Sequence, residues 1–136
     1  DGVSLGKPSS PAEAVEMIRR LRGREHAVVT GVALVDPHSG RTLTHLCRTA
    51  VHMRDYSDAE IDAYVASGDA EDKAGAYAVQ HQGFHPASHV EGCYTNVVGL
   101  PLCALLGLLS EAGYDTRSLQ LPEGCLPTVE KEKKSP

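Results

Sequence analysis

The stretch EHAVVTGVALV, residues 25–35, decides the expected fold of this chain. It is rich in β-branched residues, which favour an extended backbone, and its nearly continuous apolar run is typical of a buried strand. The next segment, DPHSG at 36–40, carries the Asp, Pro and Gly of a turn. Residues 41–53 then return with a second run of strand-forming residues. Together these segments predict a long β-hairpin.

Helices are expected on both sides of the hairpin. Upstream, SPAE at 10–13 has the pattern of a capping box with Pro at the first helical position. An apolar stripe over 14–21 follows, and Gly23 ends this helix. Downstream, SDAE at 57–60 is a second capping box, and it opens a helix that ends at Gly68.

The rest of the chain completes a mixed α/β pattern. A short strand is expected around His89 and Val90, and a helix from about Leu100 to Ala112. The predicted fold class is α/β, with long, twisted hairpin strands and helices packed on the sheet. We expect residues 1–120 to form one domain and residues 121–136 to be a flexible tail.

Composition and charge narrow the classes of function. With 136 residues, 41% apolar and 23% charged, the chain resembles an ordinary globular domain. Its net charge of -5 and its aromatic content of 4%, without Trp, argue against a nucleic-acid partner. The longest apolar run, around 97–109, is too short to span a bilayer, so no membrane partner is expected.

The cysteines and histidines give no local metal signature. The four cysteines show no C-x-x-C spacing, and reduced thiols in a cytoplasmic protein are the favoured interpretation. His81, His85 and His89 have the spacing i, i+4, i+8, but Gly83 and Pro86 interrupt any helix that would align them. The sequence therefore does not favour a zinc site there.

Two segments carry candidate chemistry. In LGKP, Lys7 lies just ahead of a helix and has the reach to hold a phosphate, although a solvated turn lysine is the alternative. In DKAGAYAVQ, Asp72 is either a ligand of a divalent metal or a helix cap. For Lys73, the expected structural role is an ion pair with an Asp or Glu on the surface. Gln80 offers a donor and an acceptor for a nucleotide base edge, or a structural amide bond.

The order of four blocks is more specific than any one of them. LGKP, RLRGREHAVVTGVALV, SDAEIDAYVASGDAEDKAGAYAVQ and EGCYTNVVGLPL resemble, in this order, the Maf (septum-formation-inhibitor) family. The resemblance runs from Leu5 to about Tyr114. It implies an ITPase-like fold and a nucleoside triphosphate pyrophosphatase, which releases a monophosphate and pyrophosphate. It also implies a divalent cation, Mg²⁺ or Mn²⁺, and a family that is often dimeric, so a homodimer is a possible partner state.

The resemblance assigns expected roles to five residues. Lys7 matches the GKP lysine of the family and would hold phosphate charge during catalysis. Gln80 matches the Gln that follows AYxx, a position associated with nucleotide selection, and is a second catalytic candidate. Asp72, Lys73 and Gly75 would shape the substrate pocket, with Asp72 as the metal ligand. The AYxxQ form resembles the branch that prefers dTTP and UTP.

Some features of the family are not in this sequence. The Ser- and Arg-rich phosphate-binding segment and the general-base Asp of the family are expected upstream of Asp1, so the chain reads as an N-terminally truncated Maf domain. The alternative function is therefore a catalytically incomplete nucleotide-binding or regulatory fragment. A third interpretation is a structural domain with a His/Cys metal site, which would contain bound zinc. His81-Gln82-Gly83 also follows Gln80 where the family commonly has Gln-Gly, which predicts a different pocket rim.

Overall fold

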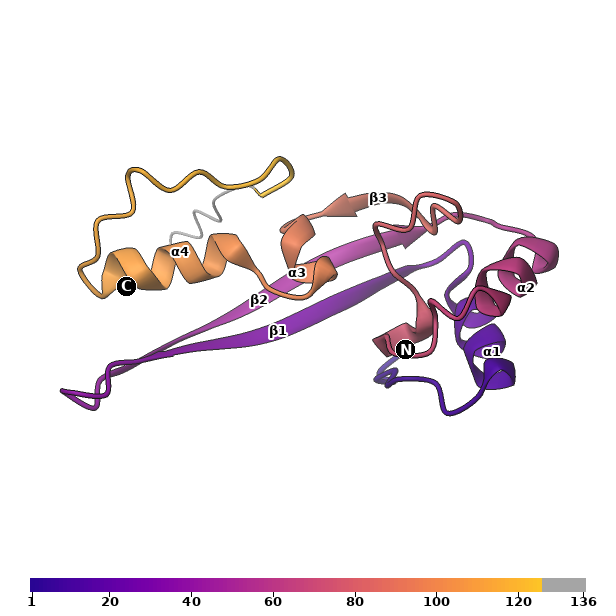
Figure 1. Ribbon diagram of the computed structural model, residues 1–136, viewed down its shortest axis with the longest axis horizontal. Helices are drawn as coiled ribbons and strands as arrows, with labels where there is room; N and C mark the ends of the chain where they lie inside the picture. The colour runs from indigo at the N-terminus through magenta and orange to yellow at the C-terminus, as the bar shows by residue number, and fades with distance from the viewer. Residues whose placement is uncertain (126–136) are drawn as a thin grey trace, which may run out of the picture. The chain divides into compact units, whose positions relative to one another are not determined.

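The computed structural model describes residues 1–125 and has the mixed α/β fold that the sequence predicts. Its three-stranded sheet has the order β1-β2-β3 (Figure 1). The elements, in chain order, are α1 (Pro11–Leu21), β1 (Glu25–Val35), β2 (Thr42–Met53), α2 (Asp58–Ala66), the 3₁₀ turn η1 (Ala74–Ala76), β3 (Ala87–Glu91), α3 (Tyr94–Val98) and α4 (Leu102–Glu111).

The chain forms two compact units. Unit 1 consists of Asp1–Ala27 and Ala50–Val90, and unit 2 consists of Val28–Thr49 and the chain from Glu91 onward. Each unit contains one part of the β1–β2 hairpin. The domain boundaries expected from the sequence stay a prediction, and most of the expected tail, residues 126–136, lies outside the described residues.

The long hairpin is confirmed, but the predicted burial of its first strand is wrong. β1 has the predicted bounds, and β2 begins one residue later than expected. No residue of β1 is buried: from Val29 onward, exposed and half-buried positions alternate. Within residues 1–125, other parts of the chain therefore pack against only one face of this strand. Val29 and Val35 keep 51% and 58% of their surface exposed.

Helix α1 begins at the predicted cap, although the capping box is only half formed. Ser10 Oγ accepts a hydrogen bond from the backbone N–H of Glu13 at 3.1 Å. The Glu13 carboxylate, however, accepts from the backbone N–H of Ser9 at 2.6 Å and from the Ser9 hydroxyl, and not from the Ser10 N–H. The predicted apolar stripe is confirmed, since Ala14, Ile18 and Leu21 are buried.

The second capping box forms completely at the start of α2. Glu60 N–H donates to Ser57 Oγ at 3.2 Å, and Ser57 N–H donates to Glu60 Oε2 at 2.8 Å. Two amides that the helix leaves without intrahelical partners are therefore satisfied reciprocally. Ile61, Tyr64 and Val65 are buried on the inner face.

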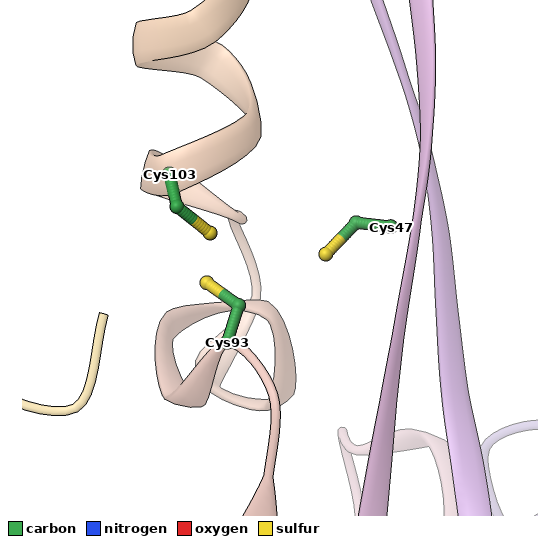
Figure 2. Close-up of side chains that lie close together, drawn as sticks. All are labelled: Cys47, Cys93 and Cys103. Carbon is green, nitrogen blue, oxygen red and sulfur yellow. The ribbon is translucent and has the colours of Figure 1, made fainter. Parts of the chain in front are cut away.

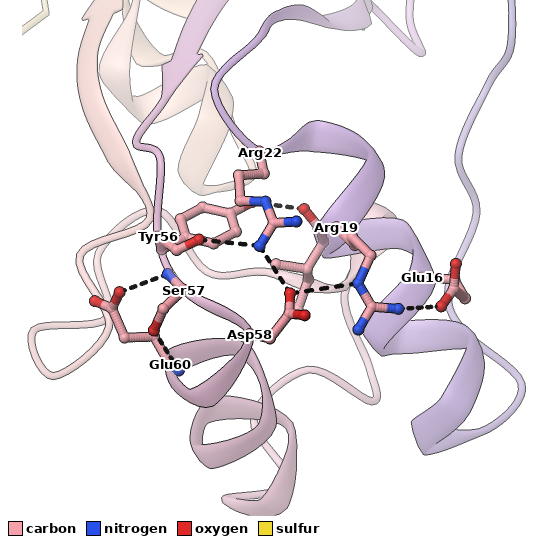
Figure 3. Close-up of polar contacts among 8 residues, drawn as sticks. Glu16, Arg19, Arg22, Tyr56, Ser57, Asp58 and Glu60 are labelled. Atoms are coloured by element: carbon pink, nitrogen blue, oxygen red, sulfur yellow. Dashed lines mark hydrogen bonds and ion pairs between the residues drawn. The ribbon is translucent and has the colours of Figure 1, made fainter.

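Polar contacts join α1 to the start of α2 within unit 1 (Figure 3). Tyr56, whose ring is almost fully buried, donates its hydroxyl to the Ile18 carbonyl at 2.7 Å. Arg22 donates to the Tyr56 carbonyl at 3.2 Å and to Asp58 Oδ1 at 2.7 Å. These bonds hold the entry into α2 against α1.

In unit 2 a buried amide ties α3 to the hairpin. Helix α4 begins just after Pro101 and stops before Gly113, close to the predicted bounds, whereas the five-residue α3 was not predicted. Asn96 of α3 is 1% exposed and donates to the Val28 carbonyl at 3.1 Å and to Thr49 Oγ1 at 3.0 Å. Among the described residues, no helix combines the length and the apolar character needed to cross a bilayer.

Candidate functional site

The LGKP and DKAGAY segments, far apart in the sequence, lie side by side in unit 1. Gly75 N–H donates to the Gly6 carbonyl at 3.0 Å. Gly75 is buried with φ of 73°, a left-handed conformation that glycine adopts without steric cost. Lys7 is close enough to Asp72 for its positive charge to contribute to the lowered pKa of that carboxyl, of which the Lys73 hydrogen bond is the main cause.

Lys73 holds two carboxylates at this site. Its Nζ donates to Asp72 Oδ1 at 2.8 Å, to the Asp69 carbonyl at 2.9 Å and to Asp69 Oδ1 at 3.3 Å. The hydrogen bond to Asp72 is the largest cause of the raised pKa of Lys73. The alternative that Asp72 caps a helix is wrong, because Lys73 is the N-cap of η1 and no side chain caps it. The ion pair expected for Lys73 is present, with its side chain half-buried.

Asp69 belongs to the same cluster and was not predicted. Tyr64 donates its hydroxyl to Asp69 Oδ2 at 2.7 Å and accepts the N–H of Ala78 at 3.0 Å. The Tyr64 hydrogen bond, helped by Lys73, lowers the pKa of Asp69, so the carboxylate is ionised at neutral pH. The sequence signal that was available is the i, i+4 spacing of Asp69 and Lys73.

Beside this cluster is an open hollow of about 570 Å³. Gln80 lies at its edge with an exposed side chain, so its amide is free to approach a ligand from solvent. Lys7 and Asp72 are outside this lining, although Asp72 contacts the lining residue Lys73. The lining residues are Asp69, Lys73, Ala78, Gln80, His81 and Gln82.

The donor set suits a hard divalent cation. Asp72 and Asp69 offer carboxylate oxygens, and the Asp72 side chain is 79% exposed, open to a cation from solvent. Mg²⁺ typically binds one or two carboxylates together with waters and substrate phosphates rather than a complete protein cage. The residues present therefore fit Mg²⁺ or Mn²⁺. Such a cation would compete with the Lys73 ammonium for the same carboxylate oxygens.

The three spaced histidines make different contacts in the described structure. His81 Nδ1 accepts the N–H of Phe84 at 2.9 Å. His85 has φ of 45°, and its carbonyl accepts a hydrogen bond from Arg54. His89 stacks on His52 with ring centroids 4.0 Å apart.

A second constellation, in unit 2, had no signal in the sequence. All four cysteines are reduced and buried. The Sγ atoms of Cys47, Cys93 and Cys103 all lie within 4.8 Å of one another and point toward a common centre (Figure 2). Because the three thiols come from β2, the start of α3 and the start of α4, no local spacing could have revealed them.

These features define an α/β protein with a candidate site of lysines, carboxylates and one exposed amide. Residues 2–112 match the family described as "Maf-like protein", and the chain belongs to this family. The resemblance seen in the sequence blocks is thereby confirmed.

Curated relatives share close to half of the aligned residues. A "dTTP/UTP pyrophosphatase" of Dehalococcoides mccartyi is 46% identical over 110 residues, covering 81% of this chain and 49% of the relative. The proteins of the same description from Dictyoglomus turgidum and Syntrophus aciditrophicus are 46% and 45% identical, over 84% and 82% of this chain. These two are covered over 59% and 55% of their own length, so the chain spans about half the length of the curated relatives it matches.

Proposed function

We propose that this chain belongs to a nucleoside triphosphate pyrophosphatase that hydrolyses dTTP- and UTP-like nucleotides to the monophosphate and pyrophosphate. The observation that carries the proposal is the description shared by relatives from three bacterial genera, "dTTP/UTP pyrophosphatase", at 45–46% identity over more than four fifths of this chain. The site in unit 1 has the charges that such a substrate requires.

In this proposal the two lysines neutralise phosphate charge. Lys7 is exposed beside Asp72 and is free to turn its ammonium toward a triphosphate. Lys73 is held by Asp69 and Asp72, so it offers a positioned charge with little conformational entropy left to lose. Stabilising the charge that develops on the phosphates during hydrolysis is the expected catalytic contribution of Lys7.

Gln80 and Gly75 shape the substrate pocket. The Gln80 amide lies exposed at the edge of the hollow and carries both a donor and an acceptor, which match the polar edge of a pyrimidine. Gly75 joins the DKAGAY turn to the LGKP segment through its N–H, and its conformation keeps the two segments in contact. Specificity and phosphate binding would thus come from adjacent parts of one turn.

Asp72 would hold the divalent cation, Mg²⁺ or Mn²⁺. The cation would supply charge neutralisation to the triphosphate and orientation to the attacking water. The lowered pKa of Asp72, due first to its hydrogen bond with Lys73, keeps this carboxylate ionised and ready to bind metal at neutral pH. The general-base Asp that the family resemblance implies is expected upstream of Asp1.

The alternative is a nucleotide-binding or regulatory fragment without turnover. The two proposals differ in one measurement, metal-dependent release of pyrophosphate. We further propose a homodimer in the cytoplasm, a compartment that keeps thiols such as these four reduced.

The test measures pyrophosphate released from dTTP, UTP and dATP in Mg²⁺ or Mn²⁺. It compares the 136-residue chain with a chimera carrying the upstream segment of the Dehalococcoides mccartyi relative. We expect dTTP and UTP to be hydrolysed by the chimera at least tenfold faster than dATP, and Lys7→Ala and Gln80→Ala to lower this activity. Arg20→Ala and Gln120→Ala, at exposed positions outside the site, are the matched controls.

Three results separate the two functions. Activity in the chimera alone supports a pyrophosphatase whose base lies upstream. Activity in both proteins supports the enzyme and shows that the 136-residue chain carries its own base. Nucleotide binding without turnover in either protein overturns the enzyme proposal and leaves the binding fragment.

A further inference from the structure

The buried cysteine cluster of unit 2 has no part in the proposed nucleotide chemistry. Cysteines make up four of the five buried residues of this small core, with Ala104 as the fifth. Cys47 lies on β2, Cys93 is the N-cap of α3, Cys103 is in the first turn of α4, and Cys125 follows Gly124. Apolar packing alone would not require four separate segments to supply the same side chain.

The sulfur atoms have a spacing suited to metal binding. In a tetrahedral zinc–thiolate site, Zn–S bonds of ~2.3 Å place the sulfurs ~3.8 Å apart. The Sγ atoms of Cys47, Cys93 and Cys103 lie within 4.8 Å of one another. Cys125 Sγ lies 3.5 Å from Cys93 Sγ but outside this group of three. We propose that the three thiols bind one thiophilic cation, with Zn²⁺ as the natural candidate, and that Cys125 moves in as the fourth ligand.

Zinc sites need neighbours that orient the ligands, and Thr95 is placed for this role. Its Oγ1 lies 3.1 Å from both Cys93 Sγ and Cys125 Sγ. The same oxygen accepts the N–H of Leu102 at 3.0 Å, so its hydroxyl proton is available for a sulfur. One hydroxyl therefore connects two of the ligands to the start of α4.

The proposed binding step exchanges protons for the cation and involves no electron transfer. On binding, the four thiols together release four protons and form four metal–sulfur bonds, so no oxidant or reductant is needed.

The consequence for the fold is a cross-link within unit 2. The cation would join β2 to the beginnings of α3 and α4 and to the segment at Cys125. Because a preformed thiolate site exists only in the folded chain, its binding free energy adds to folding stability. Zinc should therefore raise the melting temperature of the chain.

The experiment uses the 136-residue chain, reduced and freed of metal by a chelator, without oxygen. Titration with Co²⁺ should give one equivalent of the intense d–d and sulfur-to-metal charge-transfer bands of a tetrahedral thiolate site, and Zn²⁺ should displace it. Zinc should also protect all four cysteines from a chromogenic disulfide reagent. Absence of the charge-transfer bands, or four reactive thiols in excess zinc, overturns the proposal.

Variants identify the ligands. Thr95→Val removes a hydroxyl that orients the ligands and should weaken Zn²⁺ binding by about 10–100-fold. Cys103→Ala removes a ligand and should weaken it by more. His89→Ala is the matched control, because the stacked His52 and His89 rings are other candidate zinc ligands, and it should bind Zn²⁺ unchanged. Zinc binding lost in His89→Ala and kept in Cys103→Ala contradicts the site. If Cys103→Ala does not fold, the Co²⁺ spectrum and thiol count of the unmodified chain decide.

Discussion

At the scale of single residues, His26 links stability to pH. Its Nε2 lies 2.6 Å from the Tyr77 hydroxyl, and its buried Nδ1 has no hydrogen-bond partner within residues 1–125. Burial lowers the pKa of His26 below its ordinary value of 6.5, against a smaller opposite effect of Glu25. The unfolded chain therefore takes up the proton at higher pH than the folded chain. The stabilisation is present above pH 6.5 and is lost as the pH falls through the lower, folded pKa.

We therefore expect the melting temperature to fall between pH ~7.5 and ~5.5, and the fall to be smaller in His26→Gln. His38→Gln, in the exposed turn of the hairpin, is the control and should keep the slope of the unmodified chain. Thermal unfolding followed by circular dichroism at several pH values measures both slopes. Equal slopes in His26→Gln and the unmodified chain would show that His26 does not titrate differently in the two states.

Gly75 permits a second residue-scale prediction. At φ of 73° an added Cβ would meet the Tyr77 ring at 3.5 Å and Leu21 at 3.6 Å, which are ordinary contacts. Backbone strain rather than collision should therefore decide the effect, and Gly75→Ala should cost about 1–2 kcal/mol of unfolding free energy. Gly31→Ala, in β1, should cost nothing or stabilise slightly, because among the described residues nothing beyond its chain neighbours lies within 4 Å of the added Cβ. Urea denaturation compares them, and equal stabilities would contradict the strain argument.

At the scale of elements, α2 begins with a complete capping box and α1 with a partial one. At α2 the Ser57 hydroxyl and the Glu60 carboxylate satisfy each other's amides, whereas at α1 the Glu13 carboxylate turns to Ser9. Ser57→Ala should lower the unfolding free energy by about 1 kcal/mol. Ser118→Ala, at an exposed position after α4, should change it by less than about 0.5 kcal/mol. Denaturant midpoints give both values when the dependence of the unfolding free energy on denaturant concentration is unchanged. An unchanged midpoint in Ser57→Ala would show that the cap does not stabilise α2.

The same elements show what local sequence signals can predict. Strand β1 and helices α1, α2 and α4 carry their own signals, a β-branched run, capping residues and terminal glycines, so their bounds were close to correct. Helix α3 carries β-branched residues and no side-chain cap, and it forms where buried Asn96 bonds to Val28 and Thr49. Its stability comes from tertiary contacts, which a sequence window does not contain.

The candidate site residues show the same difference between local sequence signals and tertiary contacts. Lys7, Asp72 and Lys73 were predicted from two short blocks, and the Gly75–Gly6 bond that joins those blocks is a tertiary contact. The cysteine cluster brings residues of four segments together, so its thiols look unrelated in the sequence. The grouping of residues within one turn was therefore predictable, whereas a cluster assembled by packing was not.

At the scale of the whole molecule, the exposed apolar surface of the hairpin predicts association between copies of the chain. Val29, Val35 and Leu46 keep 51%, 58% and 69% of their surface exposed, unusual for large apolar side chains in a strand. Full burial of such a side chain contributes about 1.5–3 kcal/mol. The 136-residue chain should therefore form dimers as its concentration rises, and the double variant Val29→Thr/Leu46→Thr should weaken the dimer at least about tenfold.

Sedimentation velocity over a range of concentrations measures this equilibrium directly. Leu119→Thr is the matched control, because Leu119 is 53% exposed outside the hairpin and should leave the dimer constant unchanged. A chain that sediments as a monomer at every concentration would exclude association through the hairpin. Equal weakening by Leu119→Thr would instead mean that general surface hydrophobicity, and not the strands, drives association. A loss specific to the strand variant would place the contact between copies on β1 and β2.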